Sequence, residues 1–174
     1  MSASVRQLHA LPAPTSERRR LLIVEQEASP LHGEGSGDFD ETLAIAQLRG
    51  ELPVAFAQRT LQRLAAAERT GRQYGAAVIL AGRRNDAAAV AARRLIAEGL
   101  ADHGQAHCAT FELSLEAEAD ASAQARAALL QLAGELTTSG EPGRVAVRLR
   151  FGRASAPPAE IKSGTWSKPT AASA

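Results

Sequence analysis

The residue types best suited to binding chemistry lie together in one short segment, residues 82–86, with the sequence Gly-Arg-Arg-Asn-Asp. This segment follows the apolar run 76–81 and precedes a helical pattern, so it is predicted to be a loop at the carboxyl end of a strand. Glycine allows a ligand to approach the backbone closely, and arginine offers forked donors for phosphate or carboxylate. The free N–H groups of the following helix also favour an anion. The predicted anion-binding residues are Gly82, Arg83, Arg84, Asn85 and Arg93.

A structural role for the same residues is the alternative. Asp86 is suited to cap the helix that follows the loop, and the arginines can pair with carboxylates elsewhere in the fold. Only two of the 20 basic residues are lysines, so a general preference for arginine also weakens any argument from arginine alone.

Metal-binding and catalytic patterns are weak. His103 and His107 are four residues apart, but Gly104 is predicted to end the helix between them, which argues against a metal site with Cys108. Cys108 itself falls in an apolar strand pattern that is typical of a buried thiol. The carboxylates Glu25 and Glu27 are interpreted as loop residues in solvent. No catalytic residue and no cofactor are therefore predicted, and an enzyme is not favoured.

The elements that position the loop indicate an α/β fold. Apolar runs and alternation predict strands at 21–24, 42–48, 76–81, 108–115 and 144–151. Helices are predicted from Pro53 to Gly71, from the Asp86 cap to Gly104, and from a cap at Asp120 or Ser122 to residue 139. Strand–helix alternation predicts a mostly parallel, three-layer domain over residues 18–152.

The arrangement of the sheet is only partly predictable. The first two strands are expected either to pair antiparallel or to lie apart, and the order of the strands cannot be read. The last strand alternates arginines with apolar residues, which predicts an edge strand with one wet face. Residues 1–17 are expected to form a flexible arm and residues 153–174 a disordered tail. Trp166 in that tail is interpreted either as part of a docking peptide or as a residue without a role.

Composition limits the function classes. A single cysteine excludes an internal disulfide, and no apolar run is long enough to span a membrane. The absence of a signal-peptide pattern predicts a cytoplasmic protein. Residues 21–48 carry six acidic and no basic side chains, whereas residues 49–94 carry nine arginines against three acids. Such blocks either pair within the fold or steer charged partners.

Three functions follow from these patterns. The first is a regulatory or scaffold protein that acts through protein–protein contact. The second is a binder of nucleotides or other anionic metabolites at Gly82–Asp86. The third is weak nucleic-acid binding, which the acidic blocks and the lack of aromatic residues oppose. The oligomeric state is not readable from the sequence.

Overall fold

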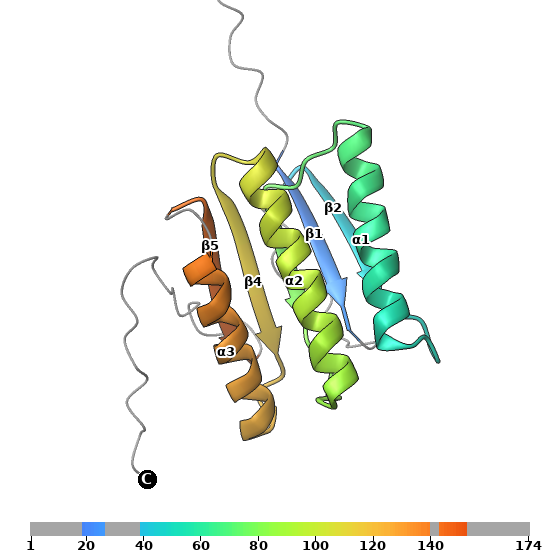
Figure 1. Cartoon of the computed structure of the whole chain (residues 1–174), viewed down its shortest axis with the longest axis vertical. Helices are drawn as coiled ribbons and strands as arrows, with labels where there is room; N and C mark the ends of the chain where they lie inside the picture. Colours follow the sequence, from blue (N-terminus) through green and yellow to red (C-terminus); the bar gives the residue numbers. More distant parts are fainter. Residues whose placement is uncertain (1–18, 27–38, 140–142, 153–174) are drawn as a thin grey trace, which may run out of the picture.

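The computed structural model describes residues 19–26, 39–139 and 143–152. They form one sheet and three long helices in the order β1 (Arg20–Glu25), β2 (Glu41–Ala46), α1 (Pro53–Arg69), β3 (Ala76–Leu80), α2 (Ala87–His107), β4 (Phe111–Ala117), α3 (Ala123–Ser139) and β5 (Val145–Phe151) (Figure 1). The predicted α/β class, with five strands and three helices, is confirmed.

All strand pairs are parallel, and the strand order is β2-β1-β3-β4-β5. The predicted alternatives for the first two strands are wrong, because β1 and β2 pair parallel, with Leu22 opposite Leu43. Parallel neighbours need a connection of about a dozen residues or more, and residues 26–40 provide it. The predicted edge position of β5 is confirmed.

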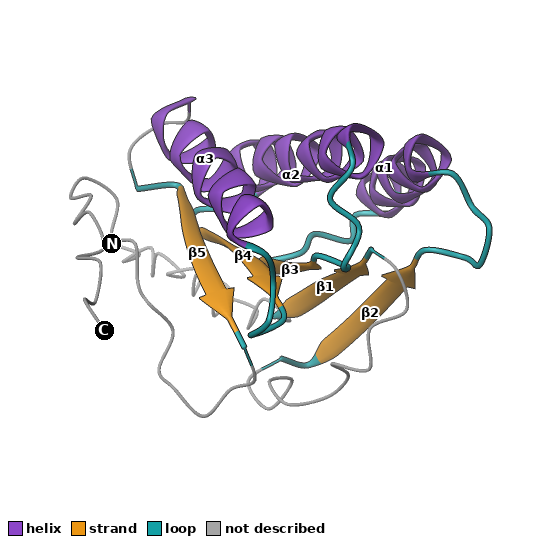
Figure 2. Ribbon diagram, turned by 90° about the horizontal axis from the view of Figure 1, so that it is seen from below, coloured by secondary structure: helices purple, strands orange, loops and turns teal. Residues whose placement is uncertain are grey.

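All three helices lie on the same face of the sheet (Figure 2). The reason is that the connections through α1, α2 and α3 all advance across the sheet in one direction, and right-handed crossovers of one direction share a face. The described part of the chain therefore has two layers, whereas the sequence predicted three.

The core lies between the sheet and the helix layer. Alternate strand residues point toward the helices, among them Leu22, Ile79, Leu113 and Val147, and each is at most 1% exposed. Aliphatic side chains supply most of this core, although Phe56 of α1 and Phe111 of β4 are completely buried in it. Burial of this apolar surface is the main force that holds the helices on the sheet.

The predicted end of α2 at Gly104 is wrong, since the helix continues to His107 and β4 begins only at Phe111. Gly104 is an interior helix residue because α2 packs tightly on β4 at this point. A Cβ at position 104 would lie 2.6 Å from Cβ of Phe111, closer than real Cβ contacts. The glycine therefore serves helix–sheet packing, and it places His103 and His107 one turn apart on one helix.

Two of the predicted caps are confirmed. The Asp86 carboxylate accepts a hydrogen bond from the Ala89 N–H at 3.0 Å, and the Ser122 hydroxyl accepts one from Ala125 N–H at 3.1 Å. Gly71, just beyond α1, has a φ of 72°, a conformation that favours glycine at a helix end. Within the described ranges, none of the helices combines the length and apolar character needed to cross a membrane.

Candidate functional site

The predicted anion-binding loop lies at the carboxyl ends of β1 and β3, as expected, but its arginines point in different directions. The exposed Arg83 forms an ion pair with Glu118 at 3.1 Å. Arg84 turns back onto Asp86, with 2.6 Å between the two charged groups. The hydrogen bonds that Ala89 N–H and Arg84 donate to Asp86 lower the pKa of that carboxyl. An anion at this loop would have to compete with Glu118 for Arg83 and with Asp86 for Arg84. Anion binding at this loop stays a prediction.

Arg93 has a different environment from the other two arginines. It is only 2% exposed, and its Nε donates to Oε1 of Gln26 at 2.8 Å. Its other nitrogens lie 3.4 Å from the Arg84 carbonyl and 3.5 Å from the Asn85 side-chain oxygen. The guanidinium thus joins α2 to the segments that follow β1 and β3. The structure brings Arg93 and Asn85 together, but in an arrangement that supports the loop.

Gln26 is the member of this network that sequence reasoning missed. It is 2% exposed, and its amide nitrogen donates to the Ala89 carbonyl at 2.7 Å. The only signal in the sequence is its position directly after an apolar strand, where a polar side chain reaches the carboxyl edge of the sheet.

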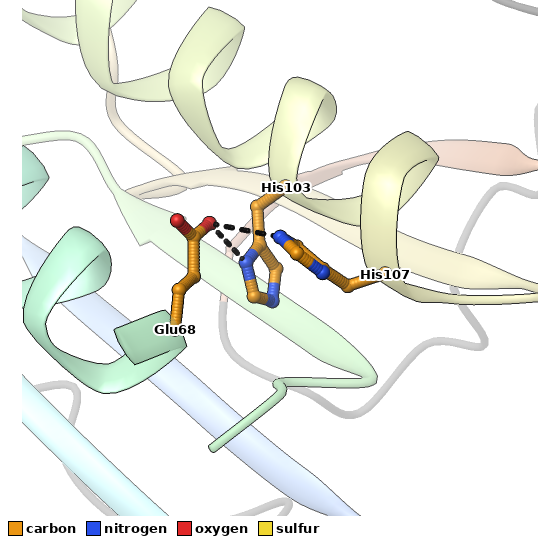
Figure 3. Close-up of side chains that lie close together, drawn as sticks. All are labelled: Glu68, His103 and His107. Carbon is orange, nitrogen blue, oxygen red and sulfur yellow. Dashed lines mark hydrogen bonds and ion pairs between the residues drawn. The ribbon is translucent and has the colours of Figure 1, made fainter. Parts of the chain in front are cut away.

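A second cluster of chemically capable side chains joins the last turns of α1 and α2 (Figure 3). Nδ1 of His103 lies 2.7 Å from Oε1 of Glu68, and Nε2 of His107 lies 3.6 Å from the same oxygen. The potential ligand atoms of these three residues all lie within 4.8 Å of one another. The extension of α2 beyond Gly104 creates this cluster, in which Glu68 takes the place that the sequence considered for Cys108.

The hydrogen bonds of His103 do not suit a metal ligand. Its Nε2 accepts a hydrogen bond from the backbone N–H of Tyr74 at 3.1 Å, so that nitrogen carries no proton. The proton of a neutral ring then sits on Nδ1, the atom that faces Glu68. A metal on Nδ1 would move this proton to Nε2, where it would oppose the Tyr74 N–H inside the core. The cluster is therefore better explained as a bridge between α1, α2 and the segment before β3, with His103 buried and His107 exposed.

A polar hollow of about 270 Å³ opens beside this bridge, at the amino edge of the sheet. This volume is slightly below the roughly 300–1,000 Å³ of typical ligand pockets. Arg20 in its wall donates to Glu41 at 2.8 Å, and Glu112 pairs with Arg148 at 3.3 Å. Most of its charged groups thus already have partners within the fold, which leaves little in the hollow to specify a ligand.

The most unusual exposed surface lies at the corner between β2 and α1, residues 47–54, which we call the apolar corner. The described part of the chain has four exposed large apolar side chains, and three of them lie here: Leu48 (62% exposed), Leu52 (68%) and Val54 (51%). In Figures 1 and 2 this connection projects from the body of the molecule at the end of β2. Water contact with three such side chains is unfavourable, and clustered exposed apolar residues mark interaction surfaces.

Hydrogen bonds hold the apolar corner in a fixed conformation. Arg59 of α1 binds both carboxylate oxygens of Glu51, at 2.8 and 2.7 Å, and also donates to the Ala46 carbonyl at 2.8 Å. The same carboxylate accepts a hydrogen bond from the Leu48 N–H at 2.9 Å. The Arg59 hydrogen bond lowers the pKa of Glu51, and the pKa of Arg59 is raised in return. The exposed leucines are therefore presented by an ordered loop.

The strand that leads into the apolar corner is an edge of the sheet. Thr42 and Ala44 of β2 are exposed, and its one charged residue, Glu41, pairs with Arg20 at its amino end. The opposite edge, β5, carries Arg148 and Arg150 in ion pairs with β4. Charged side chains protect edges from pairing with other chains, so β2 is the less protected edge within the described ranges.

Comparison of the chain with family models, with curated proteins and with solved structures finds no match.

Proposed function

We propose that this protein acts through protein–protein contact, as a regulatory or scaffold protein, and that an extended segment of its partner docks along β2 and against the apolar corner. The observation that carries the proposal is the ordered presentation of exposed leucines by the Glu51–Arg59 pair. An exposed apolar group that is held in place loses little conformational entropy on binding, which favours affinity.

The chemistry of β2 indicates what the partner segment supplies. An edge strand has backbone N–H and C=O groups on its outer side that an added strand can bind. The neutral, small side chains of Thr42 and Ala44 do not obstruct such an approach. The partner segment is therefore an extended stretch of chain with apolar side chains positioned for Leu48 and Leu52.

Photo-crosslinking tests this proposal. A photoreactive amino acid replaces Leu52 in the full chain, and a matched chain carries it at Leu95, the exposed leucine of α2. We expect irradiation of native cells to give a discrete adduct from position 52 only. Mass spectrometry then identifies the partner, which is purified for binding measurements.

The purified pair gives the decisive result. The double substitution Leu48→Ser with Leu52→Ser is expected to raise Kd at least about tenfold, since loss of buried apolar anchors costs more than about 1.4 kcal/mol. Leu95→Ser is expected to leave Kd unchanged. An identified partner that binds the double variant as tightly as the wild type contradicts the proposal.

A further inference from the structure

We infer that the partner segment that docks along β2 is acidic, because two arginines without an ion pair among the described residues border the docking surface. This inference rests on the proposed function and names the chemistry that the same site recognises. The two arginines are Arg49, in the apolar corner, and Arg63, on α1. Both are exposed, and neither forms an ion pair in the part of the chain that the structure describes.

Helix geometry places Arg63 on the face of α1 that Arg59 turns toward β2. Arg59 reaches the carbonyl of Ala46, the last residue of β2, so its face of α1 is turned toward that strand. Arg63 is one turn further along the same face, about 6 Å from Arg59 along the helix axis. In Figure 1, α1 runs back along β2. Arg63 belongs to this helix, and Arg49 follows the last residue of β2 by three positions. We therefore expect a segment that adds to the outer edge of β2 to come within reach of both guanidinium groups.

Among the residues that the structure describes, the carboxylates near this surface are already paired with other arginines. Glu51 is bound on both oxygens by Arg59, and Glu41 faces Arg20 and Arg72 at the other end of β2. Of the described residues, Arg49 and Arg63 thus offer unpaired positive charge at this surface, and opposite charges across an interface increase both the association rate and the specificity.

A protein segment explains this surface better than nucleic acid does. The groups between the arginines are an edge strand and aliphatic side chains, which pair with a peptide backbone and with apolar residues. Nucleic-acid surfaces of comparable size combine arginines with aromatic side chains that stack on bases, and the exposed apolar residues here are leucine and valine.

Selection from a library of random 12-residue peptides displayed on phage tests the inference, with the immobilised full chain as bait. The selected pool is expected to contain more Asp and Glu than Lys and Arg, combined with apolar residues. For one synthetic peptide from the pool, Arg63→Glu is expected to raise Kd about fivefold or more, and Arg49→Glu with Arg63→Glu to raise it further.

Arg69→Glu is the matched control. Arg69 is an exposed arginine in the last turn of the same helix, and it points about a third of a turn away from Arg63. The control changes the net charge by the same amount, so it separates a local contact from a general effect of charge. We expect Arg69→Glu to change Kd by less than about twofold, a weak long-range effect that salt screens.

The remaining outcomes distinguish the two proposals. In one outcome, the selected peptides lose binding to the variant Leu48→Ser with Leu52→Ser, but they show no acidic bias and tolerate Arg63→Glu. This result contradicts the inference that the partner is acidic and leaves the proposed docking function in place. A pool in which no peptide responds to the leucine substitutions overturns both. The inference is also wrong if no acidic peptide is selected and a single-stranded nucleic acid of 12 nucleotides binds the wild type but not Arg63→Glu.

Discussion

At the scale of single residues, the same residue type serves three purposes in this protein. Arg93 is buried and joins three segments, Arg59 orders a loop, and Arg63 is exposed without an ion pair in the described part of the chain. Residue type and spacing in the sequence do not separate these roles, because each depends on which atoms the guanidinium meets in the fold. Burial and hydrogen-bond partners identify the role in each case.

Arg93 is expected to contribute to stability more than any arginine of the loop it supports. Arg93→Ala leaves the side-chain oxygen of Gln26 and the Arg84 carbonyl without this donor at a buried position, so it is expected to lower the free energy of unfolding by about 2–4 kcal/mol. Urea unfolding measures this loss. Arg83→Ala is the control and should leave the midpoint unchanged, since Arg83 is 79% exposed. A larger loss for Arg83→Ala than for Arg93→Ala would reverse the roles assigned here.

The histidine cluster is expected to bind zinc poorly. Because the Tyr74 N–H occupies Nε2 of His103, a tenfold molar excess of Zn²⁺ should leave the melting temperature of the protein unchanged. Differential scanning calorimetry measures this, with His107→Ala as the control for weak surface binding. A zinc-dependent rise in melting temperature that disappears in His103→Ala would show that the bridge opens to a metal.

At the scale of elements, tight contacts explain where helices and strands begin and end. The end of α2 depends on whether Gly104 acts as a terminator or as a contact residue, and only the position of Phe111 decides between them. Gly104→Ala tests this contact. Alanine normally stabilises a helix interior relative to glycine by about 0.5–1 kcal/mol. Here the added Cβ meets Phe111, so we expect a loss of about 1–3 kcal/mol in urea unfolding. A gain in stability for Gly104→Ala would show that α2 and β4 can move apart around the added Cβ without cost.

The Glu51–Arg59 pair gives the apolar corner a pH dependence. The pKa of Glu51 is lowered in the folded chain, so the pair stabilises the protein fully above the ordinary glutamate pKa and is lost as pH falls through the lowered value. Glu51→Gln is expected to cost about 1 kcal/mol near neutral pH. The difference from wild type should shrink as pH falls below about 4.5. Urea unfolding across this pH range measures it, and a difference that persists in acid would contradict the assignment.

At the scale of the whole molecule, much of the fold could be predicted and the site could not. Apolar runs and periodicity indicated every described helix and strand, although not all of their ends, and Pro53 and Asp86 marked two helix starts, because these signals are local. The single helix layer depends on the strand order, which arises from long-range pairing and leaves no local pattern. The exposure of Leu48 and Leu52 could not be predicted either. The sequence pattern assigns Leu48 to a strand over 42–48, but β2 ends at Ala46, and the sequence does not show whether a leucine beyond a strand is covered.

The two edges of the sheet are expected to differ in their tendency to pair with other chains. Thr42→Lys places a charge on β2 and should slow aggregation during heating, because a charged edge disfavours strand addition. Ala146→Lys on β5 is the matched control and should have a smaller effect, since that edge already carries arginines. Static light scattering during a temperature ramp compares the two variants with the wild type. Equal effects at both edges would show that β2 is no more open than β5.

The phenol of Tyr74, the residue whose backbone N–H binds His103, also provides a spectroscopic reporter. Tyr74 is the single tyrosine of the chain and is 3% exposed. Burial raises the pKa of its phenol above the ordinary value, so the folded chain resists formation of the phenolate. Ultraviolet absorbance of the phenolate in mild alkali therefore records opening of the junction between α1, α2 and β3. The signal comes from one residue at a known position and needs no added label.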